Sequence, residues 1–518
     1  MNSHAVMDQA LERHRHGDLA GAEQLYRQVL RLAPSDHDAL HMLAVALAQQ
    51  GRRDEARGIF EQVISASPRD ALALTNYANV LRELGRHYAA LEMLDRALAL
   101  DPRDPERWSS RGVALQSLTR FDEALQSVER ALALRPGHPG AMRSRADLLQ
   151  SLGHYREALA AYDRLLEFAP GDAGLWNNRG MSLRNLGKLE TSSQSFERAA
   201  ALDPQMKGAK FHIGLNHLLA GDLAQGLPLY ELRKEMPLPV EARVYRQPLW
   251  TGKEDLKGKH LFAYIEQGLG DTIQFCRFIR PVRERGATVT LSVYSPMMRL
   301  LKGADLGCAL IGWGEVPGEF DYHIPLMSLP LALDTTLDTI PATLRYLAAE
   351  PERVAHWARR IGPEGFRIGV AWRGNQSVFG AEGKEFPLAA LNPLSHVPGV
   401  RLFSLQKDPG PVPDGLALEQ FDDLDRGGDA FIDSAAIIES LDLVISADSA
   451  PAHLAGALGA AVWVALKHVP DWRWHLGRDD SPWYPSMRLF RQKEPGDWGS
   501  VFREMQDALA ARMRQPTA

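Results

Sequence analysis

The first 236 residues carry an apolar pattern that repeats every 34 residues. In each period a small residue is followed, four positions later, by a large apolar or aromatic one on the same helix face. The small positions are Ala22, Ala56, Ala90, Ala124, Ala158, Ser192 and Gly226, and the large ones are Tyr26, Phe60, Leu94, Val128, Tyr162, Phe196 and Tyr230. Proline closes the periods at Pro34, Pro68, Pro102, Pro136, Pro170 and Pro204. Because proline ends a helix, each period predicts a helical hairpin whose apolar face its neighbours must cover.

This pattern resembles the tetratricopeptide repeat, with Trp108 and Trp176 at matching positions of the first helix. The resemblance covers residues 3–236 as six full repeats and a seventh without its closing proline. It implies an all-α superhelix whose concave surface binds extended protein segments. Asn76 and Asn178 occupy equivalent positions three repeats apart. They either hold the backbone of a bound peptide or are solvated polar side chains.

From Lys259 the apolar positions form short continuous runs that alternate with helical segments. The runs predict strands at Leu261–Ile265, Thr288–Val293, Cys308–Trp313, Tyr322–Pro325, Arg367–Trp372, Leu402–Leu405, Leu441–Ile445 and Val462–Leu466. Strands that alternate with helices indicate parallel, doubly wound sheets. A candidate hinge at Gly362–Gly365 separates two such halves, and we expect a ligand cleft between the carboxyl ends of their strands. A last helix, about Trp498–Met513, is expected to pack across the first half.

Length and charge narrow the class of protein. A chain of 518 residues favours several domains, and a net charge of −6 argues against a nucleic-acid partner. The first 11 residues include Asp8 and no apolar core, so they do not resemble a signal peptide. The longest apolar run, Leu454–Leu466, is too short to span a membrane. We therefore expect a cytoplasmic protein without membrane insertion.

The stretch Ala447–Gly459, where a buried strand turns into a helix, is a candidate phosphate site. Asp448 and Ser449 stand where an N-cap belongs, and Pro451 suits the first helical turn. Free N–H groups and the positive end of the helix dipole would meet there. His453, one turn into the helix, is expected to point back at the same anion. The alternative is an ordinary strand–helix corner of an α/β sheet.

Basic and aromatic residues extend this candidate site. Arg373 and Lys407 follow predicted strand ends, and Lys384 lies in a glycine-containing loop that could close over a ligand. For each of them the alternative is a solvated surface charge. Aromatic residues that either stack a base or sugar or simply pack are Trp472, Trp474, Trp483 and Tyr484.

Two further motifs do not support the chemistry that they suggest. Gly268 and Gly270 invite a dinucleotide-binding interpretation, but the third glycine position holds Ile273 and no acidic residue ends the following strand. Asp423 and Asp425 form a metal-like pair within an acidic, glycine-rich loop. We interpret that loop as solvated and expect no metal.

Residues 259–510 resemble a GT-B glycosyltransferase of the heptosyltransferase type. The matching pieces are Gly270-Asp271 after the first strand and Ala447–Ala455 in the second half, although that family has glycine where this chain has Ala450. Fused to tetratricopeptide repeats, the chain is similar in layout to protein O-GlcNAc transferases and flagellin glycosyltransferases. Other segments typical of this repeat-fused group are Gly369–Asn375, Ser404–Lys407, Asp471–Trp474 and Ser481–Pro485.

The resemblance implies a division into a repeat array at 1–236, a linker at 237–258, and two Rossmann-like GT-B lobes at 259–361 and 362–518. The first lobe would take the acceptor and the second the nucleotide sugar. Asp271 would be the general base of an inverting, metal-independent transfer; the alternative is that it only caps its helix. Residues expected to bind the donor and its phosphates are Arg373, Asn375, Lys384, Lys407, Asp448, Ser449, Ala450 and His453. No cofactor is expected, because the nucleotide sugar is a substrate.

We therefore expect a glycosyltransferase that moves a sugar to a hydroxyl of a protein acceptor, with flagellin as a candidate, recruited by the repeats. One alternative is a non-catalytic repeat scaffold or chaperone with a degenerate glycosyltransferase fold, which the Ala450 departure would fit. Another is a transferase directed at lipopolysaccharide or a glycan. The lack of an evident basic amphipathic anchor argues against a membrane role.

Overall fold

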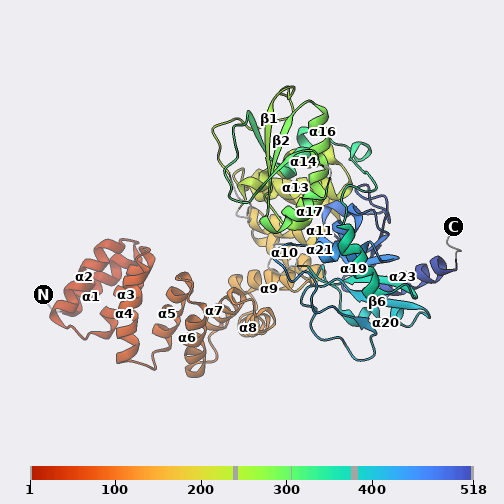
Figure 1. Ribbon diagram of the computed structural model, residues 1–518. Helices are drawn as coiled ribbons and strands as arrows, with labels where there is room; N and C mark the ends of the chain where they lie inside the picture. Colours follow the sequence, from red (N-terminus) through yellow and green to blue (C-terminus); the bar gives the residue numbers. More distant parts are fainter. Residues whose placement is uncertain (1–2, 237–242, 305, 375–382, 515–518) are drawn as a thin grey trace. The chain divides into compact units, whose positions relative to one another are not determined.

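The computed structural model describes residues 3–236, 243–304, 306–374 and 383–514 (Figure 1). Contacts divide the chain into two compact units, Met1–Ser182 and Leu183–Ala518. The described residues of the first unit form helices and their connecting turns. The second unit joins the last helices of the array to an α/β region. None of the helices in the described ranges combines the length and apolar composition that a membrane crossing requires.

Helices follow the predicted hairpin pattern, two to each period. In chain order they are α1 (Ser3–Arg15), α2 (Leu19–Leu32), α3 (His37–Gln49), α4 (Arg53–Ala66), α5 (Ala71–Glu83), α6 (His87–Leu100), α7 (Pro105–Ser117), α8 (Phe121–Leu134), α9 (Pro139–Ser151), α10 (Tyr155–Phe168), α11 (Ala173–Asn185), α12 (Leu189–Leu202), α13 (Lys207–Ala220), α14 (Leu223–Tyr230) and the 3₁₀-helix η1 (Glu231–Glu235). The small positions lie at close helix contacts: Ala22 and Ala56 are fully buried, and a Cβ on Gly226 would lie 2.6 Å from the Leu218 side chain.

The α/β region alternates short strands and helices. Its strands are β1 (His260–Tyr264), β2 (Thr288–Val293), β3 (Ala309–Gly312), β4 (Tyr322–Pro325), β5 (Phe366–Ala371), β6 (Val400–Ser404), β7 (Leu418–Glu419), β8 (Leu443–Ala447), β9 (Val462–Leu466) and β10 (Met487–Arg491). Its helices are α15 (Leu269–Phe275), η2 (Cys276–Phe278), α16 (Ile279–Glu284), η3 (Ser295–Met297), α17 (Met298–Lys302), η4 (Leu326–Ser328), α18 (Leu329–Ala332), η5 (Leu337–Thr339), α19 (Pro351–Ile361), η6 (Leu388–Leu391), α20 (Asn392–Ser395), α21 (Ile432–Ile438), α22 (Ala450–Ala457), η7 (Trp472–Trp474) and α23 (Trp498–Met513).

The strands form two sheets in which every neighbouring pair is parallel. The orders are β3-β2-β1-β4 and β10-β9-β8-β5-β6-β7. Numbered from its own first strand, the second sheet has the doubly wound order 3-2-1-4-5-6. This confirms the predicted parallel α/β region; its assignment to the GT-B class stays a prediction. Strand order reverses between β1 and β4 and between β5 and β8, so ligands are expected at the carboxyl ends of these strands.

Some elements differ from the expectation. Residues 269–284 form three short helices, α15, η2 and α16, and β7 and β10 had no predicted counterpart. The expectation that the last helix crosses the first half is wrong. Helix α23 packs on the second sheet instead, because Val501, Phe502, Met505 and Leu509 are buried in a core built on β5, β6, β8 and β9.

Packing joins the end of the array to the first sheet, so the division between units falls earlier than the predicted boundary at 236. Residues after the array are held along β4, where Trp250 N–H donates to the His323 carbonyl at 2.9 Å and His323 N–H donates to Pro248 at 3.1 Å. The 34-residue period marks each helical hairpin, whereas the unit boundary depends on which surfaces pack against one another. Helix α19, assigned by sequence to the first lobe, likewise packs on α21, with Trp357 Nε1 donating to Asp433 at 2.8 Å.

A buried ion-pair network fixes the last repeat to the carboxyl ends of β1 and β4. Arg233 on η1 is fully buried and donates to Glu266, which follows β1, and to the Ser328 hydroxyl at 2.9 Å. It also pairs with Glu231 at 2.5 Å and lies 4.9 Å from the centroid of the Tyr230 ring. Burial raises the pKa of Glu266, although Arg233 opposes the shift. The charges compensate one another inside the unit.

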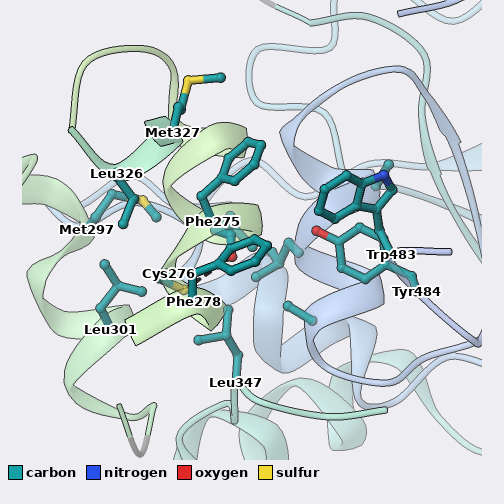
Figure 2. Close-up of a cluster of buried hydrophobic side chains, with 14 of the residues drawn as sticks. Phe275, Cys276, Phe278, Met297, Leu301, Leu326, Met327, Leu347, Trp483 and Tyr484 are labelled. Carbon is teal, nitrogen blue, oxygen red and sulfur yellow. Dashed lines mark hydrogen bonds between the residues drawn. The ribbon is translucent and has the colours of Figure 1, made fainter. Parts of the chain in front are cut away.

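One core region connects α15 and η2 to the C-terminal part of the chain. Figure 2 shows Phe275 and Phe278 between Leu326 on one side and Trp483 on the other. The ring centroids of Phe275 and Phe278 lie 5.9 and 6.4 Å from that of Trp483. This apolar packing holds the end of α15 and η2 against residues almost at the other end of the α/β region.

Candidate functional site

Asp271 lies at the start of α15, just past the carboxyl end of β1. Gly268 is the N-cap in an extended conformation, and its N–H donates to Asp271 Oδ2 at 3.0 Å. Asp271 is therefore not the N-cap of the expected alternative but the third helical residue, and its carboxylate accepts from the N–H of the N-cap residue. Its side chain still keeps 21% of its surface exposed.

Arg473 on η7 connects this carboxylate to a second one. Its Nη2 donates to Asp271 Oδ1 at 2.5 Å and its Nη1 to Asp471 Oδ1 at 2.7 Å. Its Nε donates to Gln274 Oε1 at 2.9 Å, so each nitrogen of the guanidinium has an acceptor. The Arg473 side chain is 8% exposed. This geometry fixes Asp271 on the side that faces η7.

The two carboxylates differ in acidity. Burial raises the pKa of Asp271, and the attraction of Arg473 only partly opposes it. Burial acts in the same direction on Asp471, but Arg473 and Lys384 together outweigh it and lower its pKa. A raised pKa suits a group that must accept a proton near neutral pH, so Asp271 is the better candidate base of the pair.

The predicted phosphate corner has the expected local structure. Ser449 is the N-cap of α22 in an extended conformation, and Pro451 lies in the first turn. Asp448 Oδ1 accepts from Trp474 Nε1 at 2.8 Å, and its Oδ2 pairs with Lys384 Nζ at 2.9 Å. Asp448 therefore anchors neighbouring elements, while the first N–H groups of the helix follow it.

His453 does not lie as the sequence suggested. It is buried, its Nδ1 lies 3.0 Å from the Tyr484 hydroxyl, and its ring stacks on Trp474 with centroids 5.3 Å apart. Burial, together with the nearby Arg473, lowers the pKa of His453 to about 3. The imidazole is therefore neutral at physiological pH, and its main contacts are packing contacts rather than those of a charged anion ligand.

We expect the unit Leu183–Ala518 to lose stability as pH falls from 6.5 toward 3. In this range His453 takes a proton in the unfolded chain but not in the folded one. Its destabilising effect on the folded state is therefore absent above pH 6.5 and grows as pH drops. Each pH unit costs about 1.4 kcal/mol for one such histidine. In urea unfolding between pH 7 and 4, the free energy of unfolding of His453→Gln should depend less steeply on pH than that of the unaltered protein.

The matched control is His396→Gln, which removes an exposed histidine and should keep the slope of the unaltered protein. If His453→Gln also kept that slope, His453 would be protonated in the folded state and the packing interpretation would fail.

The chain segments that follow β1 and β8, at the points where the strand order of each sheet reverses, approach each other closely. A Cβ on Gly270 would lie 3.1 Å from His453 Cδ2 and 3.3 Å from Ala450 Cα. A side chain at this position would push the start of α15 and the start of α22 apart by a few tenths of an ångström. Asp271, which follows Gly270, is thereby brought to the N-terminus of α22.

Arg277 places an additional positive charge behind this junction. It is 4% exposed, and its guanidinium lies 4.7 and 4.3 Å from the ring centroids of Tyr346 and Tyr484. It donates to the Tyr346 hydroxyl at 2.8 Å and to the carbonyl of Trp483. Within the described ranges no carboxylate forms an ion pair with Arg277. Its charge is therefore met by ring faces and carbonyl oxygens.

The other predicted donor residues are distributed around this cluster. Lys384 joins it through Asp448 and lies 3.8 Å from Asp471. Arg373, after β5, donates to the carbonyl of Asp408 at 2.6 Å, and Lys407 is exposed beside that residue. The structure therefore joins Lys384 to Asp271 through Asp471 and Arg473, and gives Arg373 and Lys407 no contact with this network. Asn375 lies outside the described residues.

The asparagines proposed to bind peptide are engaged with neighbouring repeats. Asn76 Nδ2 lies 2.9 Å from His41 Nε2, and Asn178 Nδ2 donates to Asp147 at 3.1 Å. Both contacts reach the first helix of the preceding repeat. A role in holding a peptide stays a prediction.

The interpretation of the Asp423–Asp425 loop as solvated is wrong for Asp425. This residue is 7% exposed and accepts from the N–H of Asp433 at 2.7 Å and from the Ser434 hydroxyl. It therefore holds the start of α21. Asp423 pairs with Arg360 at 2.7 Å, so the two carboxylates face different partners.

Sequence reasoning did not single out Arg473, although it sits in a segment noted as typical of repeat-fused transferases. It lies 202 positions from Asp271, and no local spacing connects the two. The signal was the run Asp471–Trp474 itself, in which an acidic and a basic residue alternate with tryptophans. Tyr484, the partner of His453, was noted only as a member of the aromatic cluster.

Comparison with known proteins separates the two parts of the chain. Sequence models of the tetratricopeptide repeat family match residues 14–62, 41–105, 115–178 and 173–206. This part of the chain is an array of tetratricopeptide repeats. The predicted repeats are thus confirmed, and such arrays typically bind protein partners.

Solved repeat proteins are similar to the chain over the array. A tetratricopeptide repeat protein from Parabacteroides merdae is 20% identical with a TM-score of 0.38, and the match covers 45% of this chain and 93% of that one. YrrB, a tetratricopeptide repeat protein with an unusual peptide-binding site, is 20% identical with a TM-score of 0.32, covering 36% and 95%.

Protein FlbA of Caulobacter vibrioides is 27% identical over 323 residues. The match covers 56% of this chain and 53% of FlbA, so the chain spans about half the length of this relative. The glycosyltransferase assignment stays a prediction beside these findings.

Proposed function

We propose that this protein is a glycosyltransferase that moves a sugar from a nucleotide sugar to a hydroxyl of a protein acceptor. One observation carries the proposal: Asp271 and the N-terminus of α22, which follow strands of two different sheets, lie in one cluster around Arg473. A carboxylate that accepts a proton and a helix terminus that stabilises phosphate are the groups that such a transfer needs.

In the proposed reaction Asp271 takes the proton of the acceptor hydroxyl as the hydroxyl oxygen bonds to the anomeric carbon. The bond between that carbon and the diphosphate breaks, and attack from the opposite face inverts the configuration. The N–H groups of Ser449 and Ala450 and the α22 dipole stabilise the leaving diphosphate. The proposal assigns no role to a metal ion.

The donor is assigned to the carboxyl ends of β5 and β8, the neighbouring strands between which the strand order reverses. A Cβ on Gly374, after β5, would lie 3.5 Å from Ser449 Cβ, so the loops that follow these two strands are adjacent. Arg373, Lys384 and Lys407 remain proposed donor-binding residues at this edge. The acceptor is proposed to be a protein because the repeats typically bind extended segments.

A nucleotide panel tests the proposal on the full chain. Uridine, guanosine, cytidine and adenosine diphosphates and their common sugar conjugates are added in turn, and melting temperature and release of free nucleotide are measured. We expect one nucleotide to raise the melting temperature by mass action and its sugar conjugate to be consumed. If no member of the panel shifted melting or was consumed, the proposal would be wrong.

A repeat scaffold without catalysis is the second candidate. It is favoured by one observation, namely that Asp271 already accepts from Gly268 and Arg473 and so has a complete structural role. In that case the panel would give neither a thermal shift nor consumption, while a protein partner would still bind the array.

A further inference from the structure

The segment that carries Arg473 is held by the seventh repeat. His475 Nδ1 lies 2.9 Å from the carbonyl oxygen of Leu218, and Leu476 N–H donates to the carbonyl of Leu219 at 3.1 Å. Both acceptors lie in the last turn of α13, where the Leu218 carbonyl also accepts from the N–H of the C-cap residue Gly221 at 3.0 Å. The repeat thus binds the chain one and two residues beyond η7.

The second helix of the same repeat, α14, contacts η7 through a side chain. The Tyr230 ring at the end of α14 packs edge-on against Trp472, with centroids 5.6 Å apart. The guanidinium of Arg473 lies 4.8 Å from the centroid of the Trp472 ring. Tyr230, Trp472 and Arg473 therefore form a continuous series of contacts that leads from the repeat to the guanidinium that binds Asp271.

The backbone at His475 is held in a conformation that is unfavourable for a residue with a side chain. Its φ of 49° and ψ of 179° lie in a region that essentially only glycine occupies. A non-glycine residue stays there only when its surroundings hold it, and such residues concentrate at functional sites. The contacts of His475 and Leu476 with α13, together with Arg491 Nη2, which donates to the His475 carbonyl at 2.8 Å, hold it there.

We infer that the seventh repeat positions Arg473 against Asp271, with His475 as the positioning residue. When the contact with Leu218 is lost, the backbone after η7 relaxes, and the guanidinium no longer faces the carboxylate at a fixed distance. The consequence for transfer rests on the proposed function, whereas the structural coupling does not depend on it.

Two substitutions at one position separate strain from contact. His475→Gly accepts the backbone conformation but cannot reach Leu218. His475→Asn keeps an N–H donor near the place of Nδ1, and asparagine tolerates positive φ better than most residues. The matched control is Thr119→Gly, which relieves a φ of 58° in the first unit.

The readout is amide hydrogen exchange of the full chain, followed by mass spectrometry of peptides that cover 268–275 and 471–476. For His475→Gly we expect about fivefold to tenfold faster exchange in both peptides, as for the loss of one hydrogen bond. His475→Asn should restore most of the protection, and Thr119→Gly should change neither peptide. Unchanged exchange at 471–476 in His475→Gly would overturn the positioning role, and a change there without one at 268–275 would overturn the coupling to Asp271.

Where the nucleotide panel identifies a donor, the same variants give a kinetic readout. His475→Gly should lower kcat several-fold with little change in KM for the donor, because α22 is not attached to η7 through His475. A purely structural loss would lower the amount of active protein, and titration of active sites detects this. If the nucleotide panel gave no result, the proposed function would be wrong. The hydrogen-exchange experiment would still test the positioning role of His475 independently.

Discussion

Asp271→Asn is expected to lose a factor of about 10²–10⁴ in turnover while keeping its fold and its affinity for the donor nucleotide. Asparagine still offers one oxygen to the Gly268 N–H. Arg473 keeps Asp471 and Gln274 as acceptors. The substitution removes the base and also the acceptor that faces Arg473, so urea unfolding checks the fold while single-turnover measurements with the donor found by the panel show the loss of the base.

The pH dependence gives an independent check. Turnover of the unaltered protein should fall as pH drops through the pKa of Asp271, because a protonated base cannot act. Burial raises this pKa, so the fall should begin above the ordinary range of an aspartate. Asp425→Asn, which alters a buried carboxylate outside the Asp271–Arg473 cluster, is the control and should keep the profile. Near-normal turnover of a folded Asp271→Asn would leave Asp271 a structural cap.

Arg233→Met is expected to destabilise the unit Leu183–Ala518 by about 3–5 kcal/mol. The substitution leaves Glu266, whose side chain is 1% exposed, without the cation that compensates it. Burial already raises the pKa of Glu266 in the presence of Arg233, so its loss forces either a buried charge or proton uptake. The cost should therefore shrink as pH falls and Glu266 becomes neutral. Urea unfolding followed by exchange of peptides from this unit would measure it.

Lys207→Met is the matched control, because Lys207 pairs with Glu235 on the same repeat but both side chains are about half exposed. Such surface pairs contribute about 0–1 kcal/mol. The double variant Arg233→Met with Glu266→Gln should recover part of the loss, since it removes the stranded charge. If Arg233→Met cost no more than Lys207→Met, the buried network would not hold the last repeat to the sheet.

Parts of the fold that depend on local chemistry could be predicted closely. The predicted bounds of β2, β4 and β9 agree with the structure, because each is a short apolar run next to turn residues. The array followed from one residue type recurring every 34 positions, and the corner at Ser449 followed from an N-cap residue before a proline. Edge strands β7 and β10 were missed because they are short or only partly apolar, with Arg488 exposed in the middle of β10.

The sequence by itself therefore determined the repeats, the alternation of strand and helix, and where single functional groups stand relative to their own element. It placed Asp271 at the start of a helix and His453 one turn into another, since both positions follow from helix period and caps. Tertiary structure alone decided which of these groups meet. Arg473 reaches Asp271 across 202 positions, and His453 faces Tyr484 and Trp474 inside the unit. The reason is physical: local pattern fixes backbone conformation over a few residues, whereas contacts between distant elements depend on how their surfaces pack.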